Sequence, residues 1–230
     1  MLRILLSIVI LVSNCAHAGQ AEYRKVESRG LGIYYREFGE GAPVLVLGGG
    51  PGDSSDRYLS LCDGLAKNHR CILVDQRGTG KSIPAVLDST TISVDLTLDD
   101  FEAVRESLGL KKWAVLGFSY GGYMASLYAH FHPESVSGLV LLGSMGLNTG
   151  AFGHFLDNIN SKLLPSDVEL FEYWNDQARV AENPKHALVE RIRARMPGYF
   201  FDRNKSLLVS QVMKDGDFNF DMGRFIWQDI

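Results

Sequence analysis

The sequence predicts an α/β fold with a mainly parallel sheet, followed by a helical insertion. Up to about residue 146, short apolar runs that end in glycine alternate with helical patterns, which is typical of βαβ units. From residue 147 onwards the patterns are helical only. The 230 residues, of which 46% are hydrophobic and 22% charged, are enough to bury a substantial core.

Six strands are expected in a core at residues 22–146. The first two form a hairpin through Arg29-Gly30-Leu31, and continuous apolar runs among the later ones indicate strands buried on both faces. The expected ranges are 23–28, 32–38, 43–47, 71–75, 113–117 and 138–142.

Helices are expected between these strands and after them. Thr97, with Asp100 three residues later, predicts a helix start that resembles a capping box, and Gly109 marks the end of that helix. Proline at a first-turn position begins two later helices. The expected ranges are 56–67, 98–108 and 120–130 in the core, and 165–180, 184–196 and 203–214 in a helical lid at 147–230.

The first 18 residues predict a secretory signal peptide. Arg3 precedes an apolar run of roughly ten residues, and Ala16-His17-Ala18 supplies a cleavage site, so we expect cleavage after Ala18 and a periplasmic or extracellular protein. The run is shorter than the about 20 residues of a membrane span. A buried N-terminal element is the alternative, and a weak lipobox pattern before Cys15 leaves a lipid anchor open.

The net charge limits the classes of partner, and the cysteine content limits the kinds of fold. A net charge of -4 and a pI near 5.9 argue against nucleic acid, which requires a basic face. Three cysteines exclude a fold built from disulfides. After loss of Cys15, Cys62 and Cys71 either pair in an oxidising compartment or remain two buried thiols.

Two glycine-rich spots suggest nucleotide binding, but both fail on spacing. A P-loop ending at Gly80-Lys81-Ser82 needs glycine where the chain has Asp75. A dinucleotide fingerprint that starts at Gly48 needs glycine where the chain has Asp53. We therefore expect no nucleotide cofactor, and no metal.

The third spot predicts a catalytic nucleophile. Gly117-Phe118-Ser119-Tyr120-Gly121 is a G-x-S-x-G motif between a buried strand and a helix, the context of a nucleophile elbow. Such a turn exposes the Ser119 hydroxyl at the mouth of a helix N-terminus. The Tyr120 amide is the first candidate donor to a developing oxyanion.

A second oxyanion donor is expected from the loop after the third strand. The glycine cluster at 48–52 lets backbone amides approach a substrate carbonyl closely. Gly50 is the preferred donor and Gly49 the next, while an ordinary tight turn is the alternative.

Three blocks together resemble the proline iminopeptidase branch of the α/β-hydrolases. They are Gly49–Gly52, Asp75–Ser82 and Gly117–Gly122, in similar order and spacing. The family usually has histidine where this chain has Gly48, and Gly-Ser-Trp where it has Phe118-Ser119-Tyr120. The resemblance implies an α/β-hydrolase fold, no cofactor, and Ser119 as the nucleophile that forms an acyl-enzyme. It also implies removal of N-terminal residues, often proline, from small peptides, so the expected partner is a small-molecule or short-peptide substrate.

The resemblance also implies a helical lid whose carboxylates bind the substrate amine. Glu169 and Glu172 lie on the first expected lid helix, where solvated surface acids are the alternative reading. For the block at 75–82 the resemblance implies a structural turn without a catalytic role.

No histidine matches the expected catalytic base. His17 leaves with the signal peptide, and His69 lies at the wrong end of its strand. His130 and His132 lie on the order of 16–20 Å along the helix from Ser119, and His154 and His186 fall in the lid. We therefore expect that the last two strands of the fold, with the acid and the base, are missing.

Three functions remain open. The first is a serine aminopeptidase, and the second is an esterase, lactonase or thioesterase that uses the same Ser119, because the elbow does not specify the leaving group. The third is a non-catalytic binding protein that retains the elbow without its base.

Overall fold

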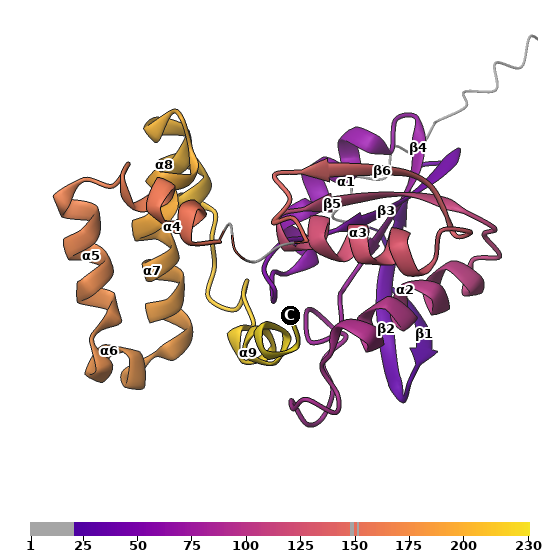
Figure 1. Cartoon of the computed structure of the whole chain (residues 1–230), viewed down its shortest axis with the longest axis horizontal. Coiled ribbons are helices and arrows are strands. Elements are labelled where there is room, and N and C mark those ends of the chain that lie inside the picture. The colour runs from indigo at the N-terminus through magenta and orange to yellow at the C-terminus, as the bar shows by residue number, and fades with distance from the viewer. Residues whose placement is uncertain (1–20, 148–149, 151) are drawn as a thin grey trace, which may run out of the picture.

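A computed structural model describes residues 21–147, 150 and 152–230, so the predicted signal peptide and Cys15 lie outside the described residues. Figure 1 shows an α/β core beside a group of helices. The core sheet has the order β1-β2-β4-β3-β5-β6. Its strands are β1 (Arg24–Ser28), β2 (Leu31–Phe38), β3 (Ala42–Leu47), β4 (His69–Val74), β5 (Trp113–Phe118) and β6 (Val136–Leu142). All six predicted strands are confirmed.

The sheet is antiparallel at one edge and parallel elsewhere. β1 and β2 form the expected hairpin, and β2 pairs with β4 antiparallel. β3 pairs in parallel with both β4 and β5, and β5 pairs in parallel with β6. The mainly parallel sheet predicted from the sequence is therefore present.

Helices cover both faces of the sheet. The 3-10 turn η2 (Ser55–Tyr58) and α1 (Leu59–Leu65) replace the single helix expected at 56–67. On the other face lie α2 (Val94–Ser107) and α3 (Tyr120–Phe131). Successive β3 side chains alternate between the two apolar clusters, with Leu45 and Leu47 in one and Val44 and Val46 in the other. The strand is thus buried on both faces, as its unbroken apolar run predicted.

The predicted start of α2 was wrong. Ser93 is the N-cap, and its side chain accepts a hydrogen bond from the Leu96 amide. Thr97 lies inside the helix, and its hydroxyl donates to the Ser93 carbonyl. Ser93 is favoured because it has an extended backbone, which lets its hydroxyl reach the first helical amides.

The second part of the chain contains more helices than expected. They are α4 (Phe152–Asn160), α5 (Pro165–Asn175), α6 (Gln177–Glu182), α7 (Pro184–Tyr199), α8 (Arg203–Gln211) and α9 (Phe220–Asp229). The helix expected at 165–180 is divided at Asp176, whose extended backbone ends α5 and whose side chain caps α6. α4 and α9 were not predicted from the sequence.

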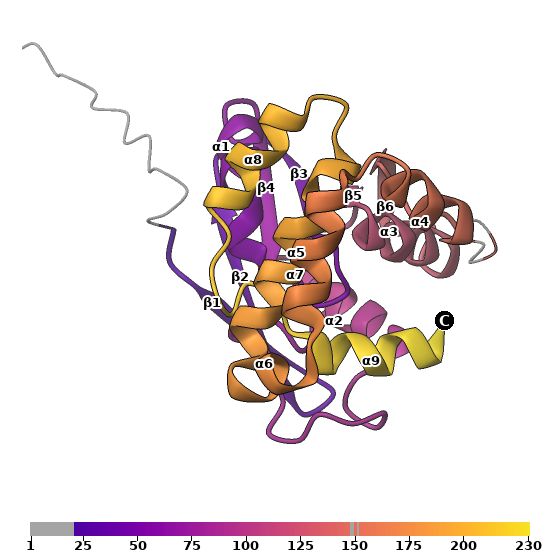
Figure 2. The same cartoon turned by 90° about the vertical axis from the view of Figure 1, so that its left-hand side faces the viewer.

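The last helix packs on the core, although residues 147–230 were predicted to be lid throughout. Met222 and Ile226 are buried in the same cluster as the α2 and α3 side chains. Asp229 accepts a hydrogen bond from the Val94 amide at the start of α2. In Figure 1, α9 lies between the α/β core and the remaining lid helices, and Figure 2 shows the same helix at the lower right.

β6 leaves an apolar edge on the sheet. Leu139, Val140, Leu141 and Leu142 are each 39–46% exposed. Within the described ranges no strand pairs with the free edge of β6.

The two described cysteines are free thiols. Cys62 on α1 and Cys71 on β4 are both fully buried in one apolar cluster. Contact with Cys62, together with burial, raises the pKa of the Cys71 thiol. The sequence left open either a disulfide or two buried thiols, and the structure contains two buried thiols. Among the helices it describes, none is long and apolar enough to cross a membrane.

Candidate active site

Ser119 occupies the turn between β5 and α3. Its backbone has φ 53° and ψ −117°, which makes it one of two non-glycine residues with positive φ in the described part of the chain. Such a conformation costs on the order of 1–3 kcal/mol and must be held by its surroundings. The strained turn predicted from the motif is therefore present.

The glycines of the motif allow the close packing that holds this turn. A Cβ at Gly117 would lie 2.2 Å from the Gly121 carbonyl oxygen. A Cβ at Gly121 would lie 2.4 Å from the carbonyl oxygens of Leu47 and Gly48. The elbow thus rests directly on the end of β3 and on the glycine loop that follows it.

Backbone hydrogen bonds fix Ser119 on its other side. Its amide donates to the Leu142 carbonyl at 3.0 Å. Its carbonyl accepts from the amides of Gly122 and Met145. The nucleophile is therefore attached to the ends of β5 and β6, and its orientation depends on the sheet.

The three predicted oxyanion donors are not equivalent. The Tyr120 amide is the first of α3, so it has no partner within the helix and lies at the positive end of the helix dipole. Gly50 is exposed, with φ +109°. Among the described residues its amide donates no hydrogen bond. The Gly49 amide already donates to the Tyr58 hydroxyl at 2.6 Å, and is therefore occupied.

The buried Tyr58 and the partly buried Asp53 form a polar pair in contact with this loop. The Tyr58 hydroxyl donates to Asp53 Oδ2 at 3.0 Å. Burial raises the pKa of Asp53, an effect that Arg57 and the Tyr58 hydrogen bond oppose. Burial, followed by the neighbouring Asp53, raises the pKa of Tyr58 well above its ordinary value. Sequence reasoning missed this pair, because no local pattern connects Tyr58 to a glycine nine residues earlier.

The histidines of the described ranges have other environments. His69 begins β4 and pairs in register with Ala42, at the opposite end of the sheet from Ser119. His132 packs on Tyr128 at the far end of α3. His186 contacts Asp215 at 3.2 Å and Trp174. No hydrogen bond between described residues joins a histidine to Ser119.

The block at 75–82 supports the fold. Asp75 is fully buried, accepts a hydrogen bond from the Lys81 amide, and also contacts the Ser55 hydroxyl. Arg77 is paired with Asp100 at 2.6 Å with both side chains buried. These contacts agree with the structural turn that the resemblance implied.

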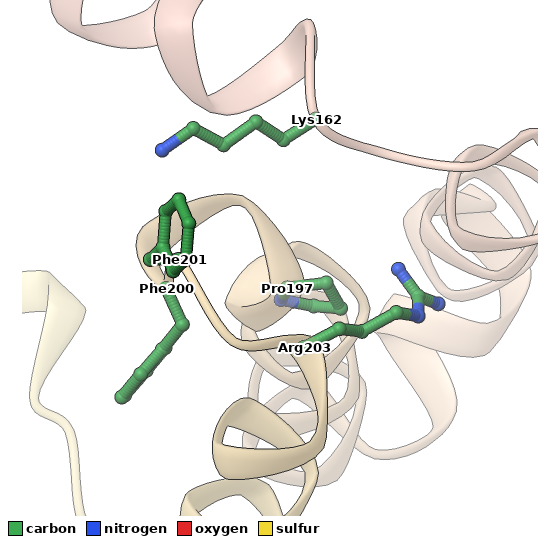
Figure 3. A pocket seen from close by; sticks show the side chains of 5 residues that line it. All are labelled: Lys162, Pro197, Phe200, Phe201 and Arg203. Carbon is green, nitrogen blue, oxygen red and sulfur yellow. The ribbon is translucent and has the colours of Figure 1, made fainter.

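The lid carries a cavity of about 300 Å³, shown in Figure 3. It is lined by Lys162, Pro197, Phe200, Phe201 and Arg203, and it includes none of the predicted site residues. Glu169 and Glu172 are exposed on α5, the helix drawn farthest from the core in Figure 1. In the part of the chain that the structure describes, no three histidine, cysteine or acidic side chains gather in a way that could hold a metal ion.

Comparisons with known proteins indicate the same fold as the sheet and the elbow do. The family model described as the alpha/beta hydrolase fold matches residues 42–208, so the chain belongs to the α/β-hydrolase fold family. A proline iminopeptidase of Neisseria gonorrhoeae is 31% identical over 215 residues, which cover 91% of this chain and 64% of that protein. The resemblance to the proline iminopeptidase branch is thus confirmed.

Two further proteins show how widely the fold is shared. A 1-acylglycerol-3-phosphate O-acyltransferase of Arabidopsis thaliana is 39% identical over 129 residues, which cover 54% of this chain and 30% of that protein. The structure of an epoxide hydrolase mutant from Vigna radiata superposes with a TM-score of 0.53 at 21% identity, covering 72% of this chain and 55% of that one. This chain spans 64–65% of the length of the Neisseria proline iminopeptidases it matches.

Proposed function

We propose that this protein is a serine hydrolase that forms an acyl-enzyme on Ser119 and acts as a proline iminopeptidase-like aminopeptidase. The observation that supports it most directly is the strained backbone of Ser119 at the N-terminus of α3, beside the glycine loop after β3. The similarity to proline iminopeptidases supports an N-terminal residue of a short peptide as the substrate.

The proposed reaction begins with attack by Ser119 Oγ on the acyl carbon of an amide. The C–O bond that forms makes a tetrahedral oxyanion, which the amides of Tyr120 and Gly50 stabilise. The C–N bond then breaks as the amine nitrogen takes up the proton that came from the Ser119 hydroxyl, which leaves the acyl-enzyme; water hydrolyses this ester to the acid and free Ser119. The hydroxyl proton must pass to a base within hydrogen-bond distance of Ser119, which the described residues do not provide.

The test of this proposal is the loss of Ser119. Ser119→Ala is expected to abolish labelling by a fluorophosphonate probe and hydrolysis of prolyl p-nitroanilide, because no other hydroxyl among the described residues shares the elbow geometry. Ser126→Ala is the matched control: it removes a hydroxyl from the same helix, where that group bonds to the Gly122 carbonyl. Labelling of the Ser119→Ala variant at the wild-type rate would exclude Ser119 as the nucleophile.

Ester cleavage or acyl transfer is the second candidate, favoured by the similarity to the Arabidopsis acyltransferase. Comparing prolyl and alanyl anilides with acetyl esters separates it from the peptidase. Turnover of esters alone would support the second candidate. A wild-type chain that neither reacts with the probe nor turns over any substrate would support a non-catalytic binding protein.

We further propose that the protein acts outside the cytoplasm. The charged start, the apolar run and the Ala16-His17-Ala18 end support export. Expression with the natural N-terminus, cell fractionation and mass spectrometry should give a mature chain that begins at Gly19. An intact N-terminus in the cytoplasmic fraction would contradict this location.

A further inference from the structure

The loop after β3 is held from inside the protein by a tyrosine hydroxyl. Gly49 is buried, and its amide donates to the Tyr58 hydroxyl at 2.6 Å, a short distance for an N–H···O bond. The same hydroxyl donates to Asp53 Oδ2 at 3.0 Å. A single phenol therefore connects the start of the loop to its end.

The Tyr58 ring fits this place closely. A Cβ at Gly48 would lie 2.5 Å from a ring carbon of Tyr58, so a side chain at position 48 would displace the ring from this place. The ring also contacts Phe118, with ring centroids 6.1 Å apart. Phe118 directly precedes Ser119, so Tyr58 contacts both the glycine loop and the residue before the nucleophile.

The far end of the loop is held from outside by the segment that returns from the lid. Asp53 forms an isolated antiparallel bridge with Phe218. The Ser54 amide donates to the Asp217 carbonyl at 2.8 Å, and the Asn219 amide donates to the Gly52 carbonyl at 2.8 Å. The Asp53 backbone is thus fixed, and its carboxylate can act as a fixed acceptor for Tyr58.

These contacts give the amides of Gly49 and Gly50 different roles. An amide that already donates to a phenol at 2.6 Å cannot also donate to a substrate oxyanion without losing that bond. The amide of Gly50, one residue further on, has no such partner in the described structure and lies at the exposed surface of the loop. Gly49 therefore serves as an anchor for the loop.

We propose that Tyr58 and Asp53 are positioning residues for the oxyanion site: they fix the Gly49 amide inward, and so present the Gly50 amide to the reacting carbonyl. This inference rests on the proposed acyl-enzyme function of Ser119. Catalysis by such donors depends on their being in place before charge develops, and a displacement of about 1 Å costs up to about 10²-fold in rate.

NMR of the glycine amides tests the anchor without relying on activity. With glycine labelled at both ¹³C′ and ¹⁵N, an HNCO spectrum selects glycines that are preceded by glycine, which in this sequence are Gly49, Gly50 and Gly122. In the wild-type chain the Gly49 proton is expected downfield, because its hydrogen bond is short. Tyr58→Phe is expected to move the Gly49 and Gly50 resonances and to leave Gly122, on the elbow helix, in place.

Steady-state kinetics test whether loss of the Tyr58 hydroxyl slows the reaction. Tyr58→Phe is expected to lower kcat by roughly 10- to 100-fold with little change in KM, because substrate binding does not need the oxyanion donors. Asp53→Asn retains an acceptor oxygen for Tyr58 and should remain closer to wild type than Asp53→Ala. Tyr128→Phe is the matched control, since it removes a buried hydroxyl that contacts Glu102 and Trp113, away from the loop.

The outcomes separate this inference from the proposed function. Unmoved Gly49 and Gly50 resonances in Tyr58→Phe, or a kcat equal to that of wild type, would overturn the positioning role. A fall in kcat matched by Tyr128→Phe would also overturn it, because it would show a general loss of stability. Equal inactivity of wild type and Ser119→Ala would instead reject the proposed function, and the glycine resonances would still decide whether Tyr58 fixes the loop.

Discussion

At the scale of single residues, the site depends on glycines, because glycine has no Cβ atom. Gly117 and Gly121 let the elbow, the end of β3 and the glycine loop approach to distances that no Cβ permits. The strain at Ser119 is maintained by this packing and by the four backbone hydrogen bonds around the residue, from its amide to Leu142 and to its carbonyl from Gly122, Tyr123 and Met145. The position of the nucleophile is therefore sensitive to changes one or two residues away from it.

Gly121→Ala is expected to destabilise the chain by about 1–3 kcal/mol, because the new methyl group overlaps the carbonyl oxygens of Leu47 and Gly48. Urea unfolding followed by circular dichroism measures the loss. Gly64→Ala is the matched control: Gly64 lies in α1 with no atom within 4 Å of its added Cβ, so it should gain about 0.5–1 kcal/mol. Equal effects of the two substitutions would show that helix propensity alone decides.

Glu102 should make stability depend on acid pH. Burial by itself would raise its pKa, but hydrogen bonds from Arg105, Tyr128 and Ser135 lower it to about 2, below the ordinary 4.5. A carboxyl with a depressed pKa stabilises the fold above its unfolded pKa, so this contribution is complete above about pH 4.5 and is lost as the pH falls towards 2.

Glu102→Gln is accordingly expected to lower stability by about 1 kcal/mol at pH 7, a value that allows for solvent screening of a partly exposed group. The difference from wild type should disappear near pH 2, which thermal melts between pH 2 and 7 would show. Glu106→Gln is the control, because this neighbour is 71% exposed and lies 3.6 Å from Arg105. A difference between Glu102→Gln and wild type that stays constant with pH would contradict the assignment.

At the scale of elements, the segment that follows the lid connects three parts of the site. Residues 217–219 bond to the loop at 52–54, and the Asn219 side chain donates to the Gly78 carbonyl at 2.7 Å. The same side chain caps α9 by accepting from the Met222 amide. α9 in turn packs Met222 against Gly78. The glycine loop, the structural turn and the last helix therefore behave as one packed unit.

Asn219→Ala removes both the cap and the bond to Gly78, and is expected to cost about 1–2 kcal/mol. It should also speed hydrogen exchange at the Ser54 amide, because the segment bonded to it loosens. Asn183→Ala is the matched control, since Asn183 caps α7 through the His186 amide and makes no contact with the loop. Faster exchange at Ser54 in both variants would indicate general loosening.

At the scale of the whole molecule, the apolar side chains of β6 lie at an open sheet edge. Leu139 to Leu142 are exposed along their whole run, whereas β3 and β5 are covered on both sides. An edge of this kind offers unpaired backbone groups and apolar surface to another chain. The isolated chain is therefore expected to associate with itself as its concentration rises.

Val140→Lys is expected to reduce this association, because a charge on an edge strand opposes pairing with a second chain. Light scattering coupled to size-exclusion chromatography measures it over a range of concentrations. Val86→Lys adds the same charge at an exposed loop position, 60% exposed, and is expected to have little effect. If the wild-type chain remains monomeric at every concentration, the β6 edge does not mediate self-association.

The sequence by itself determined the six strands, the elbow and the role of glycine around it, because each follows from a local pattern of a few residues. It did not reveal that Gly49 is anchored by Tyr58 or that Met222 packs on Gly78, since such contacts join residues far apart in the chain or outside any periodic pattern. The start of α2 depended on whether Ser93 or Thr97 had the extended backbone of a cap. Only the tertiary structure could separate the Gly49 and Gly50 amides, because their difference lies in which neighbour each one meets, and chain packing alone sets that.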